Sequence, residues 1–260
     1  MEQWKKVEIQ GLRFGEGLPK VCVPLTGQGV PALLSEMQAV SALPADLYEW
    51  RLDCFFGDPL PTLPTVVREL GGRPLLCTLR TQGEGGQARL SPEEYEQRLT
   101  ALLEKGGFGL VDIELACGEE RIPRLVSLAK RQGIGVVISK HDFAKTPPSE
   151  EIAAALRKMK PWGRPAEVCG DAPYTRGCAG TAFRHPAGQP GNRPGYHHVH
   201  GGAGQGDPRL RRGVRLLPDL WGRAERLSPR QIGAEDLRAI LEDLQPHNSQ
   251  NAEAAGEEGV

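Results

Sequence analysis

Short apolar runs that alternate with helical patterns constrain the fold of this chain more than any other feature of its sequence. Five strand-like runs lie at 21–25, 47–53, 74–80, 110–115 and 135–141. Helical patterns lie between or after them, at 30–43, 92–106, 119–132 and 149–160. This order predicts a parallel sheet. Five strands before residue 160 leave room for about eight in the whole chain, so we expect an α/β fold of the (β/α)8 TIM-barrel type rather than an open doubly wound sheet.

Local signals support parts of this pattern. Ser91 followed by Pro92 and Glu94 predicts a capping box with proline in the first turn of a helix. Ser149 followed by two glutamates predicts a second helix start. The glycine-rich stretch 83–88 is a weak match to a dinucleotide fingerprint, because the next helix starts only after Ser91 and Glu84 lies where a pyrophosphate would approach. We interpret 83–88 as a flexible loop.

The composition changes abruptly after residue 160. Residues 161–230 contain eleven arginines, five acidic residues and no lysine, isoleucine or methionine, and their formal charge is +6. The remaining residues carry a formal charge of −7. Three interpretations compete: a basic disordered arm, a histidine-rich metal segment, or a stretch translated out of frame from GC-rich DNA.

Polar residues gather where the predicted strands end. Glu49 and Arg51 are two apart on one strand, so their side chains point to the same side. Arg80 ends the next predicted strand, Glu84 follows it, and His141 ends the fifth. The carboxyl ends of barrel strands carry the active sites of TIM barrels, and two arginines, two glutamates and a histidine suit a small anionic, hydroxylated substrate. An outward ion pair at 49 and 51, a surface Arg80 and a structural His141 are the alternatives.

At these residues the sequence resembles type I 3-dehydroquinate dehydratase. The matching motifs are EWRLD at 49–53, TLRT at 78–81 with EGG at 84–86, VDIE at 111–114 and SKHDF at 139–143. PKVCVPL at 19–25 and QIGAEDL at 231–237 also match. The resemblance covers about 7–160 and 231–244.

The resemblance implies a lyase of the shikimate pathway that dehydrates 3-dehydroquinate through a Schiff base to a lysine, with no cofactor and no metal. His141 would be the general acid and base, and Glu84 would orient it. Four residues would bind the substrate: Glu49, Arg51, Arg80 and Gln231.

The Schiff-base lysine of the family is absent from the written sequence. Read one base later, permitted codons for 161–174 give Leu-Gly-Ala-Asp-Leu-Pro-Lys-Phe-Ala-Val-Met-Pro-His, a family-like strand six whose lysine codon straddles Glu167 and Val168. The same frame gives family-like strands at 196–201 and 211–222. We therefore expect two compensating insertions or deletions, one near Lys160 and one just before Gln231. The neighbour of His141, Lys140, would face the helices and is not expected to replace the lysine.

These observations set our expectations for the whole chain. We expect one barrel domain at 1–244, disrupted from about residue 161, and a disordered tail at 245–260. As written, the chain is expected to fold poorly and to be inactive. The alternatives are a barrel remnant whose basic segment, with its histidines and with arginines between 209 and 215, binds metal or nucleic acid, or another Schiff-base lyase or aldolase.

Composition also bounds location and partners. No apolar run approaches the roughly 20 residues that span a bilayer, and residues 1–6 lack the apolar core of a signal peptide, so we expect a cytoplasmic protein. None of the six cysteines forms a Cys-x-x-Cys pair, and we expect buried thiols. The expected partner is the substrate 3-dehydroquinate, with no nucleic acid and no membrane; a homodimer is left open.

Overall fold

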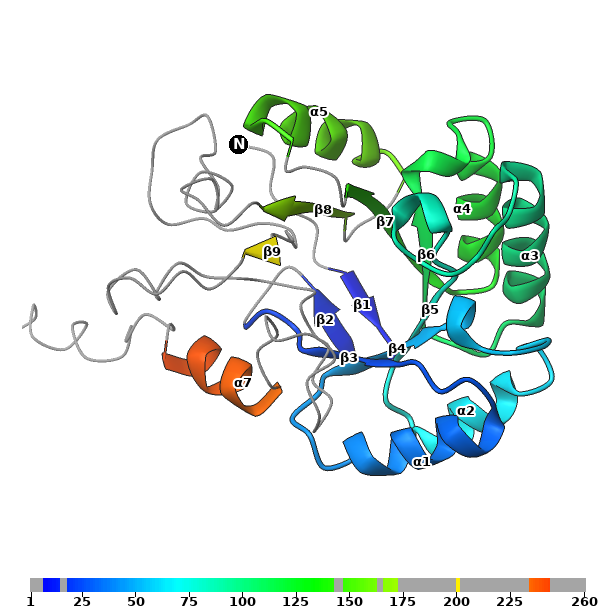
Figure 1. Cartoon of the computed structure of the whole chain (residues 1–260), viewed down its shortest axis with the longest axis vertical. Helices are drawn as coiled ribbons and strands as arrows, with labels where there is room; N and C mark the ends of the chain where they lie inside the picture. Colours follow the sequence, from blue (N-terminus) through cyan, green and yellow to red (C-terminus); the bar gives the residue numbers. More distant parts are fainter. Residues whose placement is uncertain are drawn as a thin grey trace, which may run out of the picture.

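A seven-stranded sheet forms the centre of the molecule (Figure 1). The computed structural model describes residues 7–14, 18–142, 147–162, 166–172, 200–201 and 234–243. The strands follow one another in chain order: β3 (Cys22–Leu25), β4 (Leu47–Arg51), β5 (Leu75–Thr78), β6 (Leu110–Glu114), β7 (Gly135–Asp142), β8 (Ala166–Ala172) and β9 (His200–Gly201). All their pairings are parallel. This is the predicted barrel topology, although within the described residues no pairing closes the sheet into a ring.

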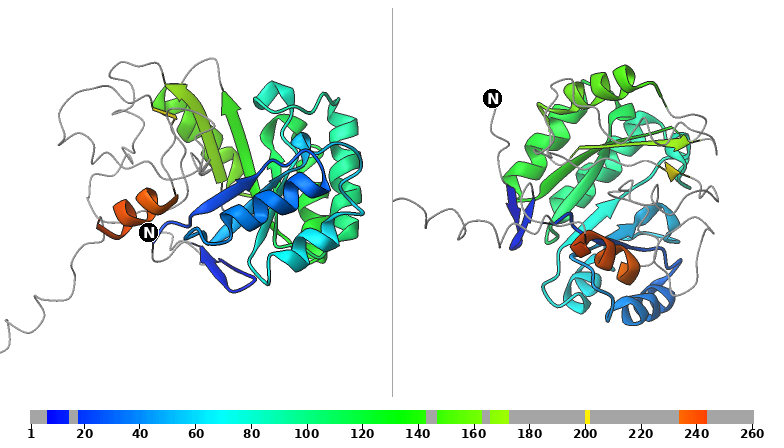
Figure 2. Two further views of the ribbon diagram at one scale, coloured as in Figure 1. Left: turned by 60° about the horizontal axis from the view of Figure 1, so that its bottom comes forward. Right: turned by 90° about the vertical axis from the view of Figure 1, so that its left-hand side faces the viewer.

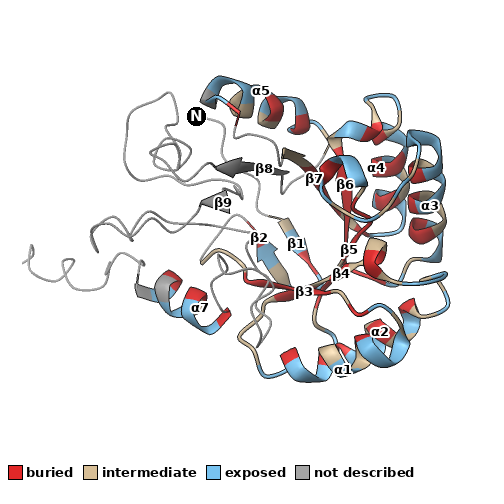
Figure 3. Cartoon of the chain, in the orientation of Figure 1, coloured by how far each residue is buried: buried red, intermediate tan, exposed pale blue. Residues whose placement is uncertain are grey.

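Helices cover the outside of the curved sheet (Figures 1 and 2). They are α1 (Val30–Val40), α2 (Leu63–Glu69), α3 (Pro92–Lys105), α4 (Ile122–Arg131) and α5 (Ser149–Met159). Their inward faces are buried and their outward faces are exposed (Figure 3). The Ser91 capping box is confirmed, because the Ser91 side chain accepts from the Glu94 amide and Glu94 accepts from the Ser91 amide. α5 starts at Ser149 as predicted, but its N-cap is Pro148 and no side chain caps it.

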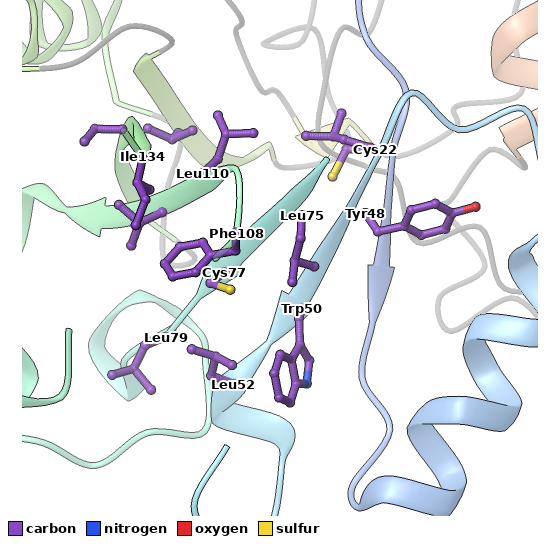
Figure 4. Packing of buried hydrophobic residues seen from close by; sticks show 14 of the residues in the cluster. Cys22, Tyr48, Trp50, Leu52, Leu75, Cys77, Leu79, Phe108, Leu110 and Ile134 are labelled. Carbon is purple, nitrogen blue, oxygen red and sulfur yellow. The ribbon is translucent and has the colours of Figure 1, made fainter. Parts of the chain in front are cut away.

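The core lies between the sheet and the helices (Figure 4). Trp50 on β4 and Cys77 on β5 are paired in register and fully buried, and the Trp50 ring meets Phe55 edge to face with 5.3 Å between ring centroids. Every residue of β6 is buried, which is typical of parallel strands covered on both faces. The expectation of buried thiols is confirmed for four of the six cysteines: Cys22, Cys54, Cys77 and Cys117.

A hairpin that the sequence pattern did not predict lies at the amino-terminal end of the strands. Its strands β1 (Val7–Ile9) and β2 (Leu12–Phe14) pair antiparallel, and Ile9 and Phe14 are buried. A methyl group at Gly135, the first residue of β7, would overlap Ile9, so this glycine lets the hairpin approach closely. The hairpin therefore covers the end of the sheet opposite to the carboxyl ends of the strands.

The sheet continues beyond residue 160, where the change in composition led us to expect disruption. β8 pairs with β7 through five register pairs, from Ile138 with Ala166 to Asp142 with Gly170, and two residues of β9 pair with β8. Ladder hydrogen bonds use backbone groups that every residue except proline carries in full, so a segment of unusual composition can still extend a sheet. β8 and β9 thus take the places of strands six and seven of a barrel, with β8 beside β7 and β9 beside β8.

The chain returns to the first strands at α7 (Ala234–Asp243). Ala234, Leu237 and Leu241 are buried, and the Arg238 guanidinium donates to the Pro44 carbonyl at 3.0 Å and to Asp46 Oδ2 at 2.6 Å. Asp46 immediately precedes β4, so α7 lies beside the start of the sheet (Figure 2). In the part of the chain that the structure describes, no helix combines the length and the apolar character needed to span a bilayer.

Candidate active site

Four of the predicted site residues gather at the carboxyl ends of β4, β5 and β7: Arg51, Arg80, Glu84 and His141. Arg51 is the last residue of β4, Arg80 lies two residues after β5, and His141 lies next to the end of β7. Short 3₁₀ turns follow three of the strands: η1 (Leu52–Cys54) after β4, η2 (Gln82–Glu84) after β5 and η3 (Leu115–Cys117) after β6. Their tight backbone turns the chain back over the end of the sheet and brings Glu84 toward β7.

His141 and Glu84 form the pair that the sequence predicted. Glu84 Oε2 lies 3.0 Å from His141 Nδ1 and also accepts the His141 backbone N–H at 3.0 Å. Both side chains are less than 10% exposed. The two bonds to one carboxylate oxygen fix the position of the ring by its Nδ1 edge.

Arg80 lies at the centre of a group of buried carboxylates. Its Nη1 is 3.3 Å from Glu84 Oε2, 3.2 Å from Glu114 Oε1 and 2.8 Å from Ser139 Oγ. Its Nη2 lies 3.1 Å from Asp112 Oδ1. The Arg80 side chain is 7% exposed, which argues against the alternative of a surface arginine. The guanidinium thus neutralises acids beneath the His141–Glu84 pair, and direct contact with a substrate stays a prediction.

Arg51 is paired differently from the sequence expectation. Its Nε and Nη2 donate to the two oxygens of Asp53 at 2.9 and 2.8 Å, in a bidentate pair. Burial lowers the pKa of Arg51, but the hydrogen bonds to Asp53 and the charge of Glu49 outweigh burial and raise it. Glu49 therefore lies close enough to act on Arg51, as strand alternation predicted, while Asp53 holds the guanidinium.

Burial sets the protonation of the central pair. Burial and the nearby Arg80 charge lower the pKa of His141, and the hydrogen bond to Glu84 with its charge only partly opposes them. Burial, with the Glu114 charge, raises the pKa of Glu84 above its usual value, against the effect of His141 and Arg80. A neutral imidazole that donates from Nδ1 presents an unprotonated Nε2. The arrangement can therefore act as a general base near neutral pH.

The sequence analysis did not select several residues that the structure brings into the site. They are polar and buried or half-buried: Asp53, Thr81, Asp112, Glu114 and Ser139. Alternation along the strand, used for Glu49 and Arg51, also applies to Asp112 and Glu114, which are two apart in an otherwise apolar strand. Two acids on one side of a buried strand were therefore a usable signal. Thr81 and Ser139 become significant only through the partners that the fold gives them.

The structure describes only some of the other residues that the sequence analysis selected. Glu167 and Val168, where the lysine codon was expected, lie on β8 and are paired in register with Ser139 and Lys140. Gln231, the arginines between 209 and 215 and the tail at 245–260 lie outside the described residues. In the described part of the chain, no three histidine, cysteine, aspartate or glutamate side chains are grouped so that they could hold a metal ion.

Known proteins match this chain in sequence and in fold. The family model of type I 3-dehydroquinase matches residues 21–165. The 3-dehydroquinate dehydratase of Enterococcus faecalis is 41% identical over 170 residues, which are 64% of this chain and 66% of that protein, or about two thirds of its length. The 3-dehydroquinate dehydratase of Syntrophotalea carbinolica is 34% identical over 255 residues, covering 90% of this chain and 96% of that protein.

The fold gives the same result. A crystal structure of the type I 3-dehydroquinate dehydratase of Clostridium difficile, with covalently modified comenic acid, superimposes with a TM-score of 0.78 at 26% identity. The superposition covers 93% of this chain and 98% of that one. Sequence and fold agree, and the chain belongs to the type I 3-dehydroquinase family.

Proposed function

We propose that this site is built to dehydrate 3-dehydroquinate to 3-dehydroshikimate, with His141 as the group that moves protons. The observation that carries the proposal is the buried hydrogen bond between His141 Nδ1 and Glu84 Oε2 at the carboxyl end of the sheet. With Nδ1 held by Glu84, a neutral imidazole can act as a base through its other ring nitrogen. Arg51, held by Asp53, and the nearby Glu49 supply charges for the carboxylate and hydroxyl groups of such a substrate.

The reaction that we propose uses an imine. A lysine amine condenses with the substrate ketone and releases water, and the resulting iminium weakens the adjacent C–H bond. His141 removes that proton and returns a proton to the hydroxyl group that leaves as water. Hydrolysis of the imine then releases the unsaturated ketone and restores the lysine.

We place the missing lysine on β8, at position 167. Glu167 is paired in register with Ser139, and Ser139 is paired with Glu114, so the three positions form one row across the sheet. Ser139 and Glu114 both contact Arg80 inside the site. A lysine in this row would bring a cation to a group of carboxylates. It would lie two residues before Cys169, which is paired in register with His141.

Lys140 does not serve as a substitute in this proposal. It lies on β7 between Ser139 and His141, whose side chains both contact site residues. Because successive side chains of a strand point to opposite faces, Lys140 belongs to the other face. The written chain is therefore expected to form no imine, and translation of 161–230 in a shifted frame accounts for the loss.

Trapping with borohydride tests the proposal directly. Borohydride reduces an imine to a stable amine, so a substrate adduct on a lysine is detected by mass spectrometry. We expect no adduct and no enone product from the chain as written. A frame-restored chain, in which 161–230 is read from the shifted frame, should give one adduct on the β8 lysine and form product.

Two controls separate the parts of this proposal. In the frame-restored chain, replacing the β8 lysine by methionine should abolish both adduct and product, whereas His141→Gln should remove product formation while some adduct remains. A lysine adduct on the chain as written would contradict the placement of the nucleophile. An unambiguous in-frame DNA sequence that encodes 161–230 as written would exclude the frameshift.

A further inference from the structure

The loop that carries Glu84 is closed on itself at its base. The Gln82 amide donates to the Ala88 carbonyl at 2.8 Å and the Ala88 amide donates to the Arg80 carbonyl at 3.2 Å. Within it, the Gly86 amide donates to the Thr81 carbonyl at 2.8 Å. Residues 80–88, which we name the Glu84 loop, can therefore move as a unit, and its attachment to the sheet decides where the Glu84 carboxylate lies.

Asp53 attaches one side of the Glu84 loop to β4. Its side chain is fully buried, and it accepts the backbone N–H of Arg80 at 3.3 Å and of Gln87 at 3.0 Å. These two amides lie near the two ends of the loop. Asp53 is itself fixed by the bidentate pair with Arg51.

Glu114 attaches the other side of the loop to β6. Its two oxygens accept the Thr81 backbone N–H at 2.8 Å and the Thr81 hydroxyl at 2.6 Å, and its side chain is 1% exposed. A buried carboxylate that accepts two bonds from one residue fixes both the position and the orientation of that residue. Thr81 directly precedes η2, whose last residue is Glu84.

We propose that Asp53 and Glu114 are positioning residues, which clamp the Glu84 loop from β4 and from β6 so that the Glu84 carboxylate meets His141. Neither acid contacts His141 in the hydrogen bonds described above; each acts through the loop. The consequence for catalysis rests on the proposed function, but the clamp is measured on the imidazole and does not need turnover.

The groups that act on the His141 ring make it a suitable probe. Glu84 on η2 and Asp112 on β6 raise its pKa, while burial and Arg80 lower it. In the hydrogen bonds described above, Asp53 and Glu114 contact the Glu84 loop and not the His141 ring. Variants that differ in how they hold the loop, compared with and without Glu84, therefore separate movement of Glu84 from the direct loss of a charge.

The experiment is an NMR titration of the histidine ring in the full-length chain, with His141→Gln used to assign the signal. Glu84→Ala should lower the His141 pKa by about one pH unit, as expected for the loss of one close opposite charge. Asp53→Ala and Glu114→Ala should each lower it in the same direction. Glu114→Gln is the matched control: it lacks the charge as Glu114→Ala does, but its amide can still accept from the Thr81 N–H and donate to the Thr81 hydroxyl, so the His141 pKa should fall less than in Glu114→Ala.

A double variant decides whether the effect passes through Glu84. In a Glu84→Ala background, Asp53→Ala should cause no further change, because the group that the clamp positions is absent. Equal shifts from Asp53→Ala in both backgrounds, or equal shifts from Glu114→Ala and Glu114→Gln, would overturn the proposal. If Asp53→Ala fails to fold, the comparison of Glu114→Ala with Glu114→Gln still decides the outcome. Failure of the imine experiment would leave these results unchanged.

Discussion

At the scale of single residues, the site depends on one buried arginine that contacts three buried acids. Arg80 contacts Glu84, Asp112 and Glu114, and all four side chains are almost completely buried. Burial raises the pKa of Glu84 and of Glu114, and the neighbouring acids Glu114 and Asp112, respectively, add to this rise. The same burial keeps the His141 ring neutral. Electrostatics that looks unfavourable for stability is thus what prepares the histidine as a base.

The lowered pKa of His141 predicts how stability depends on pH. The unfolded chain binds a proton at this histidine as the pH falls through about 6.5, whereas the folded protein does not, so the free energy of unfolding should decrease there. The raised pKa values of Glu84 and Glu114 have the opposite sign, favouring the fold at lower pH. Urea unfolding of the wild type and of His141→Gln isolates the histidine, and the wild type should lose more stability between pH 7 and pH 5, a range that brackets this value. Equal pH dependence in the two proteins would contradict a lowered His141 pKa.

Sequence alone identified the His141–Glu84 pair but not its supports. The pair belongs to motifs that resemble a family, so its roles could be predicted from local residues. Asp53 lies in one of those motifs, yet its partners Arg80 and Gln87 are 27 and 34 residues away. Contacts of that range follow from the sheet register, which no single stretch of sequence specifies.

At the scale of elements, the Glu84 loop shows where glycine is required. A methyl group at Gly86 would lie 2.1 Å from the Arg80 carbonyl oxygen, so Gly86→Ala must displace the backbone that leads to Glu84. We expect a loss of about 1–3 kcal/mol in the free energy of unfolding, as for other overpacked sites, measured by urea denaturation. Gly83→Ala in the same loop is the matched control, because its methyl group would come no closer than 3.9 Å to another residue. A similar loss for both variants would show that the loop does not depend on the close approach at Gly86.

Elements with strong local signals were predicted well, and short ones were not. α3 begins at the predicted capping box, because the reciprocal bonds of Ser91 and Glu94 need only four consecutive residues. The hairpin β1–β2 and the seven-residue α2 were missed. Their stability comes from packing against the sheet, so their sequences carry little periodicity of their own.

At the scale of the whole molecule, the curved parallel sheet follows from the alternating pattern, and its extent beyond residue 160 does not. The β7–β8 pairing uses backbone groups and is insensitive to the change in composition that marks 161–230. The frameshift that we propose would therefore damage the chemistry more than the strand pairing. This difference explains how a chain can keep the family fold at a TM-score of 0.78 without the lysine that the proposed reaction needs.

α7 returns to the first strands of the sheet, and the contacts that hold it there give the last prediction. Arg238 links α7 to Asp46 and to the Pro44 carbonyl, more than 190 residues earlier in the sequence. Arg238→Met keeps an apolar stem but removes these charged hydrogen bonds, and we expect α7 to lose about 1.5 kcal/mol of local stability, or roughly tenfold in amide protection. Hydrogen exchange measured by mass spectrometry on peptides from α7 checks this, with Arg68→Met on the exposed face of α2 as the matched control. Unchanged protection in Arg238→Met would mean that the buried Leu237 and Leu241 hold the helix in place without its link to Asp46.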